Sequence, residues 1–146
     1  MAIYPLTSVQ QAVWLDQLLT PSTPCYNVGA LWRIEREVDI TLLNQAINET
    51  LAQHDALKLT LKESEGGIIQ TTVSNQDFTL EYHDFSQDND AEKKAREYLK
   101  DKFNQPFKLY EELLWRCVFI KTTATTALWL ILSLIHISEP TRQEAI

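Results

Sequence analysis

The side chains of this sequence best suited to proton transfer are its three histidines. His136 follows an apolar run, Ala127 to Ser133, that is typical of a buried strand. A histidine at the end of such a strand can act as a general base, but His136 has no orienting partner in a recognisable pattern. His54 is expected at the end of a helix, where it would cap the last carbonyls, and His83 is expected to be exposed. The residues alone therefore offer one candidate base, His136.

Other site chemistries lack the residues that they need. The patterns GxGxxG, GxxxxGK[ST], HExxH, CxxC and GxSxG are all absent, which excludes nucleotide-loop, zincin, zinc-ribbon and α/β-hydrolase sites. Cys25 and Cys117 have no metal-ligand spacing, so two reduced, buried thiols are predicted, with a disulfide as the alternative. The four tryptophans are expected to fill the core. We predict no bound metal and no bound cofactor.

Composition limits the classes of partner. With 146 residues, 45% of them hydrophobic, the chain is one domain or part of a larger one and is not intrinsically disordered. Its 13 basic and 20 acidic residues give a net charge of −7, which disfavours nucleic acid as a partner. No secretory signal is visible, and the longest apolar run, Ala127 to Ile137, is far shorter than the roughly 20 residues that span a bilayer. A cytoplasmic protein without a membrane partner is expected.

Helical periodicity occurs in three segments. Capping boxes at Thr7 and Ser8 begin a helix that Pro21 ends, Asp39 caps a helix over 40–54, and 90–104 is the third helix. The expected core faces are Ala12, Leu15 and Leu19 in the first helix, Ile40, Leu43, Ile47 and Leu51 in the second, and Ala91, Ala95, Leu99 and Phe103 in the third.

Two-residue alternation and apolar runs predict the strands. Their expected ranges are 29–36, 57–62, 68–73, 78–83, 113–121 and 127–133, with Gly66-Gly67 as a hairpin turn. The last two are almost continuously apolar, which indicates burial on both faces. The order α-β-α-β-β-β-α-β-β predicts an α/β fold, a two-layer sandwich on a largely antiparallel or mixed sheet.

Several segments match the motifs of one family in order and spacing. In PLTSVQQAVWL, Thr7, Gln10 and Trp14 are in register with S-x-A-Q-x-x-x-W, although Thr replaces Ser and Val9 takes the Ala position. QHDALKLTL is similar to R-H-E-x-L-R-T-x-F, with His54 and Leu57 as the matches. Together these segments resemble the condensation domains of nonribosomal peptide synthetases.

Shorter matches extend the resemblance over residues 5 to about 131. PCYN, which ends at Asn27, is similar to P-A-Y-N, and PFKL over 106–109 is similar to P-F-D-L. LWR, which ends at Arg116, is similar to the P-L-x-R segment that enters the next strand. The resemblance implies that Thr7, Gln10, Trp14, His54, Leu57 and Arg116 are motif or scaffold positions.

The catalytic motif of this family, H-H-x-x-x-D-G, is expected just after the strand over 127–133. His136 falls at its second histidine, but Ile135 stands at the first, and Pro140-Thr141 stands at the Asp-Gly pair. Residues 132–142, LSLIHISEPTR, are similar to the translation of a transposase-type sequencing adapter. We therefore expect 1–131 to be a truncated N-terminal subdomain and 132–146 a non-native tail, with His136 at the motif position by chance.

The resemblance also implies a fold and a reaction. The chain would be the chloramphenicol-acetyltransferase-like N-terminal half of a V-shaped domain whose C-terminal half is missing. Such domains form an amide bond between acyl or aminoacyl thioesters that carrier proteins present on phosphopantetheine arms, beside an adenylation domain in the parent synthetase. The chain alone would be inactive.

Two alternatives remain open at this point. One is an epimerization or other acyltransferase domain of the same superfamily, which shares the early motifs. The other is a non-catalytic domain that recruits partner enzymes or carrier proteins.

Overall fold

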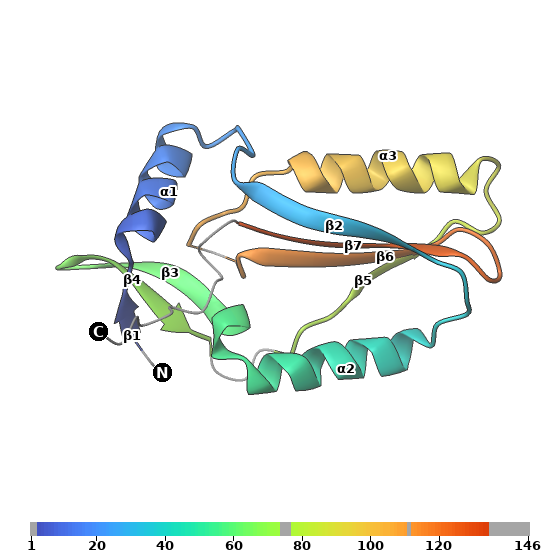
Figure 1. Cartoon of the computed structure of the whole chain (residues 1–146), viewed down its shortest axis with the longest axis horizontal. Coiled ribbons are helices and arrows are strands. Elements are labelled where there is room, and N and C mark those ends of the chain that lie inside the picture. Colours follow the sequence, from blue (N-terminus) through green and yellow to red (C-terminus); the bar gives the residue numbers. More distant parts are fainter. Residues whose placement is uncertain (1–2, 74–76, 111, 135–146) are drawn as a thin grey trace.

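The computed structural model describes residues 3–73, 77–110 and 112–134 (Figure 1). The elements follow one another as β1 (Ile3–Pro5), α1 (Ser8–Leu19), β2 (Asn27–Ile34), α2 (Ile40–Gln53), the 3-10 turn η1 (Asp55–Lys58), β3 (Leu59–Ser64), β4 (Gly67–Thr72), β5 (Glu81–Asp84), α3 (Ala91–Asn104), β6 (Trp115–Lys121) and β7 (Ala127–Leu134). The predicted order is confirmed, and β1 and η1 are additions to it. None of the helices in the described ranges is long and apolar enough to cross a bilayer.

The strands form two sheets. The larger has the order β2-β7-β6-β5, with β5 parallel to β6 and the other pairs antiparallel. The smaller has the order β1-β4-β3, in which β3 and β4 form the predicted hairpin and Gly67 adopts a φ of +117° that favours glycine. In Figure 1 the larger sheet lies between α3 and α2, while α1 lies beside the smaller sheet. The α/β class is confirmed, and helices cover both faces of the larger sheet.

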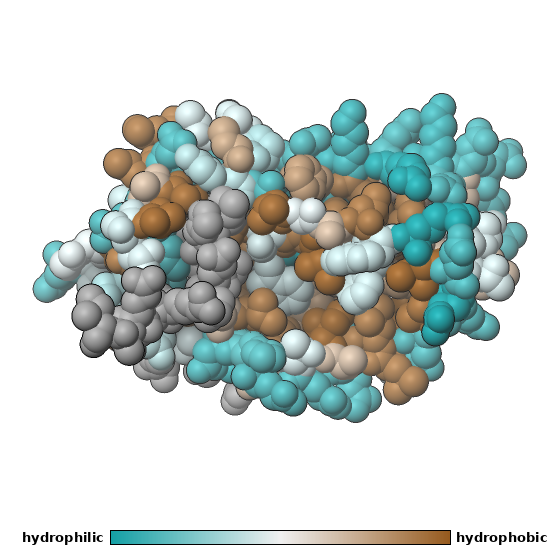
Figure 2. All heavy atoms as spheres, in the orientation of Figure 1, coloured by the Kyte–Doolittle hydropathy of each residue, from teal (hydrophilic) through white to brown (hydrophobic). Residues whose placement is uncertain are grey.

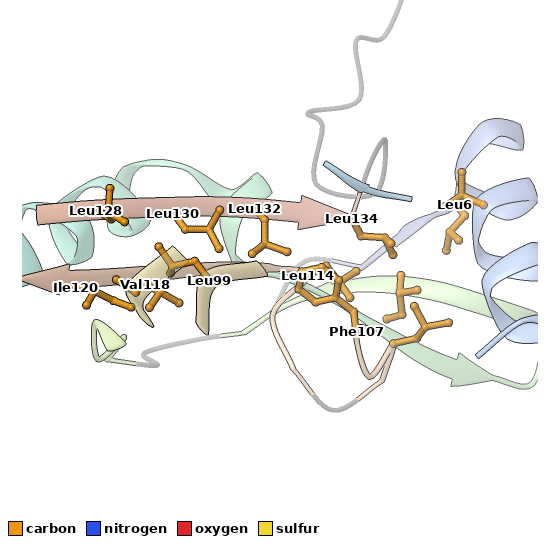
Figure 3. Packing of buried hydrophobic residues seen from close by; sticks show 14 residues of the cluster. Leu6, Leu99, Phe107, Leu114, Val118, Ile120, Leu128, Leu130, Leu132 and Leu134 are labelled. Carbon is orange, nitrogen blue, oxygen red and sulfur yellow. The ribbon is translucent and has the colours of Figure 1, made fainter. Parts of the chain in front are cut away.

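The first core lies under α3. Alternate side chains of β6 and β7 point to this helix, and Ala95 and Leu99 of α3 meet them with 0% and 2% of their surface exposed. Figure 3 shows Leu128, Leu130 and Leu132 in one row, followed by Leu134 and Leu114 toward Leu6. This row therefore continues from the larger sheet into the region beside α1.

The second core lies under α2, on the opposite face of the same sheet. The predicted stripe of Ile40, Leu43, Ile47 and Leu51 packs there, against Trp115, Cys117, Phe119 and Ala127 of β6 and β7. Because successive residues of β6 and β7 serve different cores, both strands are buried on both faces, as their continuous hydrophobicity predicted.

The predicted core face of α1 is wrong. Leu15 and Leu19 are exposed by 49% and 72%, and Ala12 is exposed as well. The buried residues of α1 are Gln10, Val13 and Gln17 instead. Both atoms of the Gln10 amide have hydrogen-bond partners, and the Gln17 Nε2 donates to the Thr20 and Thr23 carbonyls, which offsets part of the cost of desolvating the two side chains.

Three smaller expectations also need correction. Both cysteines are free, as predicted, but only Cys117 is buried, and Cys25 is exposed. Trp32 is 45% exposed because it lies on β2 at the edge of the larger sheet, so it is not a core residue. His83 is half-buried because it packs against Tyr98 of α3.

The close approach of β2 to β7 depends on Gly29. A Cβ at this position would lie 2.6 Å from the Ile131 carbonyl oxygen and 2.7 Å from the Leu132 Cβ. Gly29 pairs with Leu132 across the two strands, so the missing side chain is what lets the two backbones approach each other.

Replacing Gly29 by alanine should therefore destabilise the fold. We expect Gly29→Ala to lower the free energy of unfolding by about 2 kcal/mol, because β7 must move to relieve the overlap. Denaturant unfolding followed by circular dichroism measures this. Gly66→Ala is the matched control, since nothing lies within 4 Å of its added Cβ. Equal stabilities for the two variants would contradict the prediction.

Candidate functional site

The candidate site is the carboxyl end of β7, where the motif of the resembled family is expected. Leu134 is the last described residue; it pairs with Asn27 of β2, and its backbone N–H donates to the Leu114 carbonyl at 2.9 Å. The positions expected for the motif, Ile135 to Thr141, lie outside the described residues, and so does His136. The strand itself continues beyond residue 131, because Leu132 and Leu134 are buried within it. The boundary at about residue 131 and the non-native tail stay predictions.

Thr7 and Gln10 fix the start of α1. The Thr7 hydroxyl accepts from the Gln10 N–H at 3.2 Å, and the Gln10 Oε1 accepts from the Thr7 N–H at 2.8 Å, which is a complete capping box. The Gln10 amide also exchanges hydrogen bonds with the Gln70 amide of β4, and the Gln70 Nε2 donates to the Pro5 carbonyl. These two motif residues therefore join α1 to the smaller sheet. Sequence reasoning missed Gln70, since a single glutamine in a strand gives no signal.

Trp14 connects α1 with the segment after α3. Its indole Nε1 donates to the Tyr110 hydroxyl at 2.8 Å. Near this contact is a groove of about 330 Å³, which is lined by Gln17, Leu18, Pro21 and residues 106–110. The groove is mostly apolar, and none of the described residues that line it is a carboxylate or a histidine. Trp14 thus has a bridging position and is only half-buried.

His54 and Leu57 lie at the end of α2. His54 is the residue that ends this helix, as predicted, and its backbone N–H donates to the Leu51 carbonyl at 3.3 Å. Leu57 lies in η1, and its carbonyl accepts from the Trp115 Nε1 at 2.8 Å. Trp115 stacks on Phe78 with 4.7 Å between ring centroids. The second motif thereby holds the end of α2 against the start of β6.

Arg116 holds the carboxyl end of α3. Its guanidinium donates to three carbonyls there, of Lys102 at 3.4 Å, Gln105 at 2.6 Å and Pro106 at 2.7 Å, and to a Glu112 carboxylate oxygen at 2.9 Å. It also lies over the Phe107 ring, 4.1 Å from the centroid. Helix ends leave carbonyls without partners, and a planar group with five donors suits several of them at once.

Asn27 contributes to the same helix end and was not among the expected site residues. Its Nδ2 donates to the Phe103 carbonyl at 2.7 Å and the Gln105 carbonyl at 3.1 Å. Since Asn27 also pairs with Leu134, it connects the end of α3 directly with the end of β7. The PCYN resemblance was the signal that could have singled it out.

Shifted pKa values occur in a polar cluster between β5 and α3. Burial alone would raise the pKa of Glu81, but hydrogen bonds from Tyr98, His83 and Lys102 outweigh it and lower this pKa. The pKa of Tyr98 is raised to about 12, mainly by burial and secondly by the hydrogen bond to Glu81. β5 is the edge strand opposite β2, so this cluster fastens α3 to the far side of the sheet and does not belong to the site.

The described residues provide a scaffold around the end of β7. The six expected residues lie in three arrangements, at the start of α1, at the end of α2 and at the end of α3. Burial raises the pKa of Cys117 to about 11, so its thiol is not a nucleophile near neutral pH. No cluster of three potential metal ligands occurs in the described ranges. The structure thus places supporting contacts close to the strand end from which the motif positions follow.

Arg116 should tolerate lysine poorly. We expect Arg116→Lys to lower the free energy of unfolding by about 2 kcal/mol, since an ammonium group cannot reach all the carbonyls that the guanidinium satisfies. Arg96→Lys, at an exposed ion pair with Glu92, is the control and should change it by less than about 0.5 kcal/mol. Denaturant titration compares the two variants. A similar loss in both would contradict a special role for Arg116.

Tyr98 should make stability depend on alkaline pH. Its pKa rises from 10.0 to about 12 in the folded chain, so its contribution is complete below pH 10 and is lost as pH rises toward 12. Unfolding free energies measured across this range should fall less steeply for Tyr98→Phe than for the unchanged chain. Each unfolding free energy is expressed relative to the value of the same protein at neutral pH. The comparison then excludes the constant loss of stability that Tyr98→Phe causes by removing the hydrogen bond. Identical slopes would contradict the assignment.

The sequence is similar to condensation domains along nearly all of its length. The family described as Condensation domain matches residues 1–137. Surfactin synthase subunit 2 from Bacillus subtilis (strain 168) is 27% identical over 135 residues, which are 92% of this chain and 4% of that protein. The dimodular nonribosomal peptide synthase of the same organism is 30% identical over 118 residues, which are 80% of this chain and 5% of that protein.

Solved structures agree on the fold. The starter condensation domain of rhizomide synthetase RzmA has a TM-score of 0.86 at 23% identity and covers 94% of this chain, which spans 34% of that structure. The first condensation domain of the calcium-dependent antibiotic synthetase, solved with a substrate analogue, has a TM-score of 0.80 at 23% identity. There the match covers 92% of this chain and 33% of the solved one. The chain thus spans about a third of these structures and a few per cent of the synthetases.

The family match, the motifs at Gln10, His54 and Arg116, and the fold all agree. The chain belongs to the condensation domain family of the nonribosomal peptide synthetases.

Proposed function

We propose that this chain is the first part of a domain that joins two carrier-bound thioesters through an amide bond. The observation on which this rests is the family match, which runs from residue 1 through β7 to residue 137, where the catalytic motif is expected. The amine of an acceptor thioester would attack the carbonyl of a donor thioester, so that one C–N bond forms and the donor C–S bond breaks. The amine proton is transferred to the donor sulfur, which leaves as a thiol.

The scaffold contacts support this role in a specific way. A histidine base acts only when it is held within hydrogen-bond reach of the attacking amine. The motif positions follow the end of β7, where the backbone at position 134 pairs with Asn27 on one side and donates to the Leu114 carbonyl on the other, contacts that do not depend on which side chain stands there. Arg116 and Asn27 fasten the adjoining end of α3. These contacts support a rigid attachment for the motif loop. Residues of this chain would orient the loop, and residues beyond β7 would carry out the reaction.

The substrates and partners proposed here follow from the family. Acyl or aminoacyl groups would arrive on phosphopantetheine arms of carrier proteins, and an adenylation domain of the same synthetase would supply the activated amino acid. No cofactor bound by the domain itself is proposed. We also propose a cytoplasmic location and, for residues 132–146, an adapter-derived origin, which implies that the catalytic motif of the native sequence is not that around His136.

The test uses the genomic continuation of this coding sequence. We expect it to encode H-H-x-x-x-D-G soon after β7, and the complete domain to form an amide from two carrier proteins loaded with aminoacyl thioesters, detected by mass spectrometry. Two controls, the domain with its second motif histidine changed to alanine and the 146-residue chain alone, should give no product.

Three other outcomes would overturn the proposal in different directions. Inversion of a carrier-bound aminoacyl centre without amide formation would assign the domain to epimerization. Binding of carrier proteins without either reaction, together with a continuation that lacks both histidines, would indicate a recruiting domain. Amide formation by the 146-residue chain alone would refute the need for a second half.

A further inference from the structure

The first residue of β2 carries a buried carbonyl oxygen that still lacks a hydrogen-bond donor. Asn27 Oδ1 is buried and accepts no hydrogen bond from the residues that the structure describes, while the Asn27 Nδ2 donates to the Phe103 and Gln105 carbonyls. Those two oxygens can only accept, so the amide nitrogen faces them and Oδ1 points elsewhere. Gln17 Oε1 is in the same state, but it lies on α1 and not at the end of the larger sheet.

Asn48 of α2 shows the same arrangement with its full set of partners. It is also half-buried, and its Nδ2 also donates to two carbonyls, those of Asn44 at 2.9 Å and Phe78 at 2.8 Å. Its Oδ1, however, accepts from the Phe78 N–H at 2.8 Å. The two asparagines therefore differ in one hydrogen bond, and Asn27 is the one whose oxygen waits for a donor.

The surroundings of this oxygen make a donor necessary. Asn27 lies opposite Leu134, whose fully buried side chain belongs to the core under α3, so both side chains lie on that face of the sheet. Figure 2 shows that the sheet presents a broad apolar area below the hydrophilic surface of α3. A buried carbonyl oxygen is costly to leave unpaired in such surroundings, because it has lost its water without gaining a partner.

The strand ladder indicates where the donor comes from. Figure 1 shows the beginning of β2, the end of α3 and the end of β7 at the same end of the larger sheet. The Leu134 N–H donates to the Leu114 carbonyl, on the β6 side, so the residue after it is expected to turn its backbone groups toward β2. β2 begins at Asn27, whose own N–H already donates to the Pro24 carbonyl at 3.3 Å. The side-chain amide of Asn27 is what β2 offers at this point.

We propose that in the complete domain Asn27 Oδ1 accepts a hydrogen bond from the backbone N–H of the residue that follows β7. That residue begins the expected H-H-x-x-x-D-G motif, so Asn27 holds the backbone directly before the second motif histidine. Asn27 is then a positioning residue, because it acts on the reaction only through the loop that carries the base. The inference rests on the proposed function for the identity of that loop, but the contact itself can be measured without the reaction.

A crystal structure of the complete domain, encoded by the genomic continuation, is the direct test. We expect the backbone nitrogen of the first residue after β7 to lie within about 3.2 Å of Asn27 Oδ1. A water molecule or a side chain of the second half at this oxygen, in place of that nitrogen, would overturn the proposal. This measurement needs no variant that could misfold and no substrate.

Hydrogen exchange tests the same contact in solution. Asn27→Ala removes the acceptor, so the amide after β7 should exchange about tenfold faster in the complete domain, as measured by mass spectrometry on peptides that cover this segment. Asn48→Ala is the matched control, since it also removes an asparagine that donates to two carbonyls, but at α2. It should leave this exchange rate unchanged. Equal acceleration in both variants would indicate a general loosening and would contradict the specific contact.

Asn27→Asp separates the acceptor from the donor of the side chain. It keeps an oxygen for the loop but loses the N–H groups that hold the end of α3, so the fold should be destabilised as in Asn27→Ala. The exchange rate after β7 should nevertheless stay within about threefold of that of the unchanged domain. Exchange as fast as in Asn27→Ala would assign the effect to the end of α3 and would refute the role of Oδ1.

The kinetics of amide formation give the functional readout. Asn27→Ala should lower kcat about tenfold and leave KM for the carrier proteins within about twofold, since a displaced base slows the reaction without removing a substrate contact. Asn27→Asp should restore most of kcat, and Asn48→Ala should keep all of it. An unchanged kcat in Asn27→Ala would refute the positioning role. A complete domain that forms no amide would refute the proposed function alone, because the crystal structure and the exchange rates still decide whether Oδ1 has this donor.

Discussion

The structure depends on the antiparallel pairing of β6 with β7 and on the burial of both faces of that pair. These strands lie at the centre of the larger sheet, and α3 and α2 close over their opposite faces. A strand buried on both sides cannot tolerate a shift of one residue, since every side chain would move to the other core. The row from Leu128 to Leu134 therefore sets the register of β2 and the position of α3, and it determines where the strand ends. The candidate site begins at that end.

Polar side chains satisfy the backbone and amide groups around this apolar centre that have no partner within the sheet. The end of α3 has carbonyls that the sheet cannot satisfy, and Arg116 of β6 and Asn27 of β2 donate to them from the two sides of β7. Between α1 and the smaller sheet, the side-chain amides of Gln10 and Gln70 satisfy each other through two hydrogen bonds. In each case a residue of a family motif satisfies backbone or amide groups that would be costly to bury unpaired. This gives a physical reason why a chain of this family needs those residue types before any reaction is considered.

Much of the fold was predictable from local pattern. The stripe of α2, the hairpin at Gly66-Gly67 and the doubly buried late strands all followed from periodicity, because burial on one or two faces imposes that periodicity directly. α1 was not predictable in this way. Its leucines suggested the core face, yet Gln10, Val13 and Gln17 are buried, since the partners of both glutamines come from residues outside the helix. Of the site, the six motif positions could be named from the sequence, but the contacts of Asn27 and Gln70 could not, because they join residues 60 or more positions apart.

The sequence by itself determined the helices and strands, the acidic balance and the membership suggested by the motifs around Gln10, His54 and Arg116. These depend on residue types and short spacings, which the chain displays without folding. The tertiary structure alone decided that Arg116 and Asn27 meet at one helix end, that α1 buries amides, and that β2 lies at the edge of the sheet that the described strands form. Each of these depends on which strands become neighbours, and that is decided by the cooperative burial of β6 and β7 between two helices.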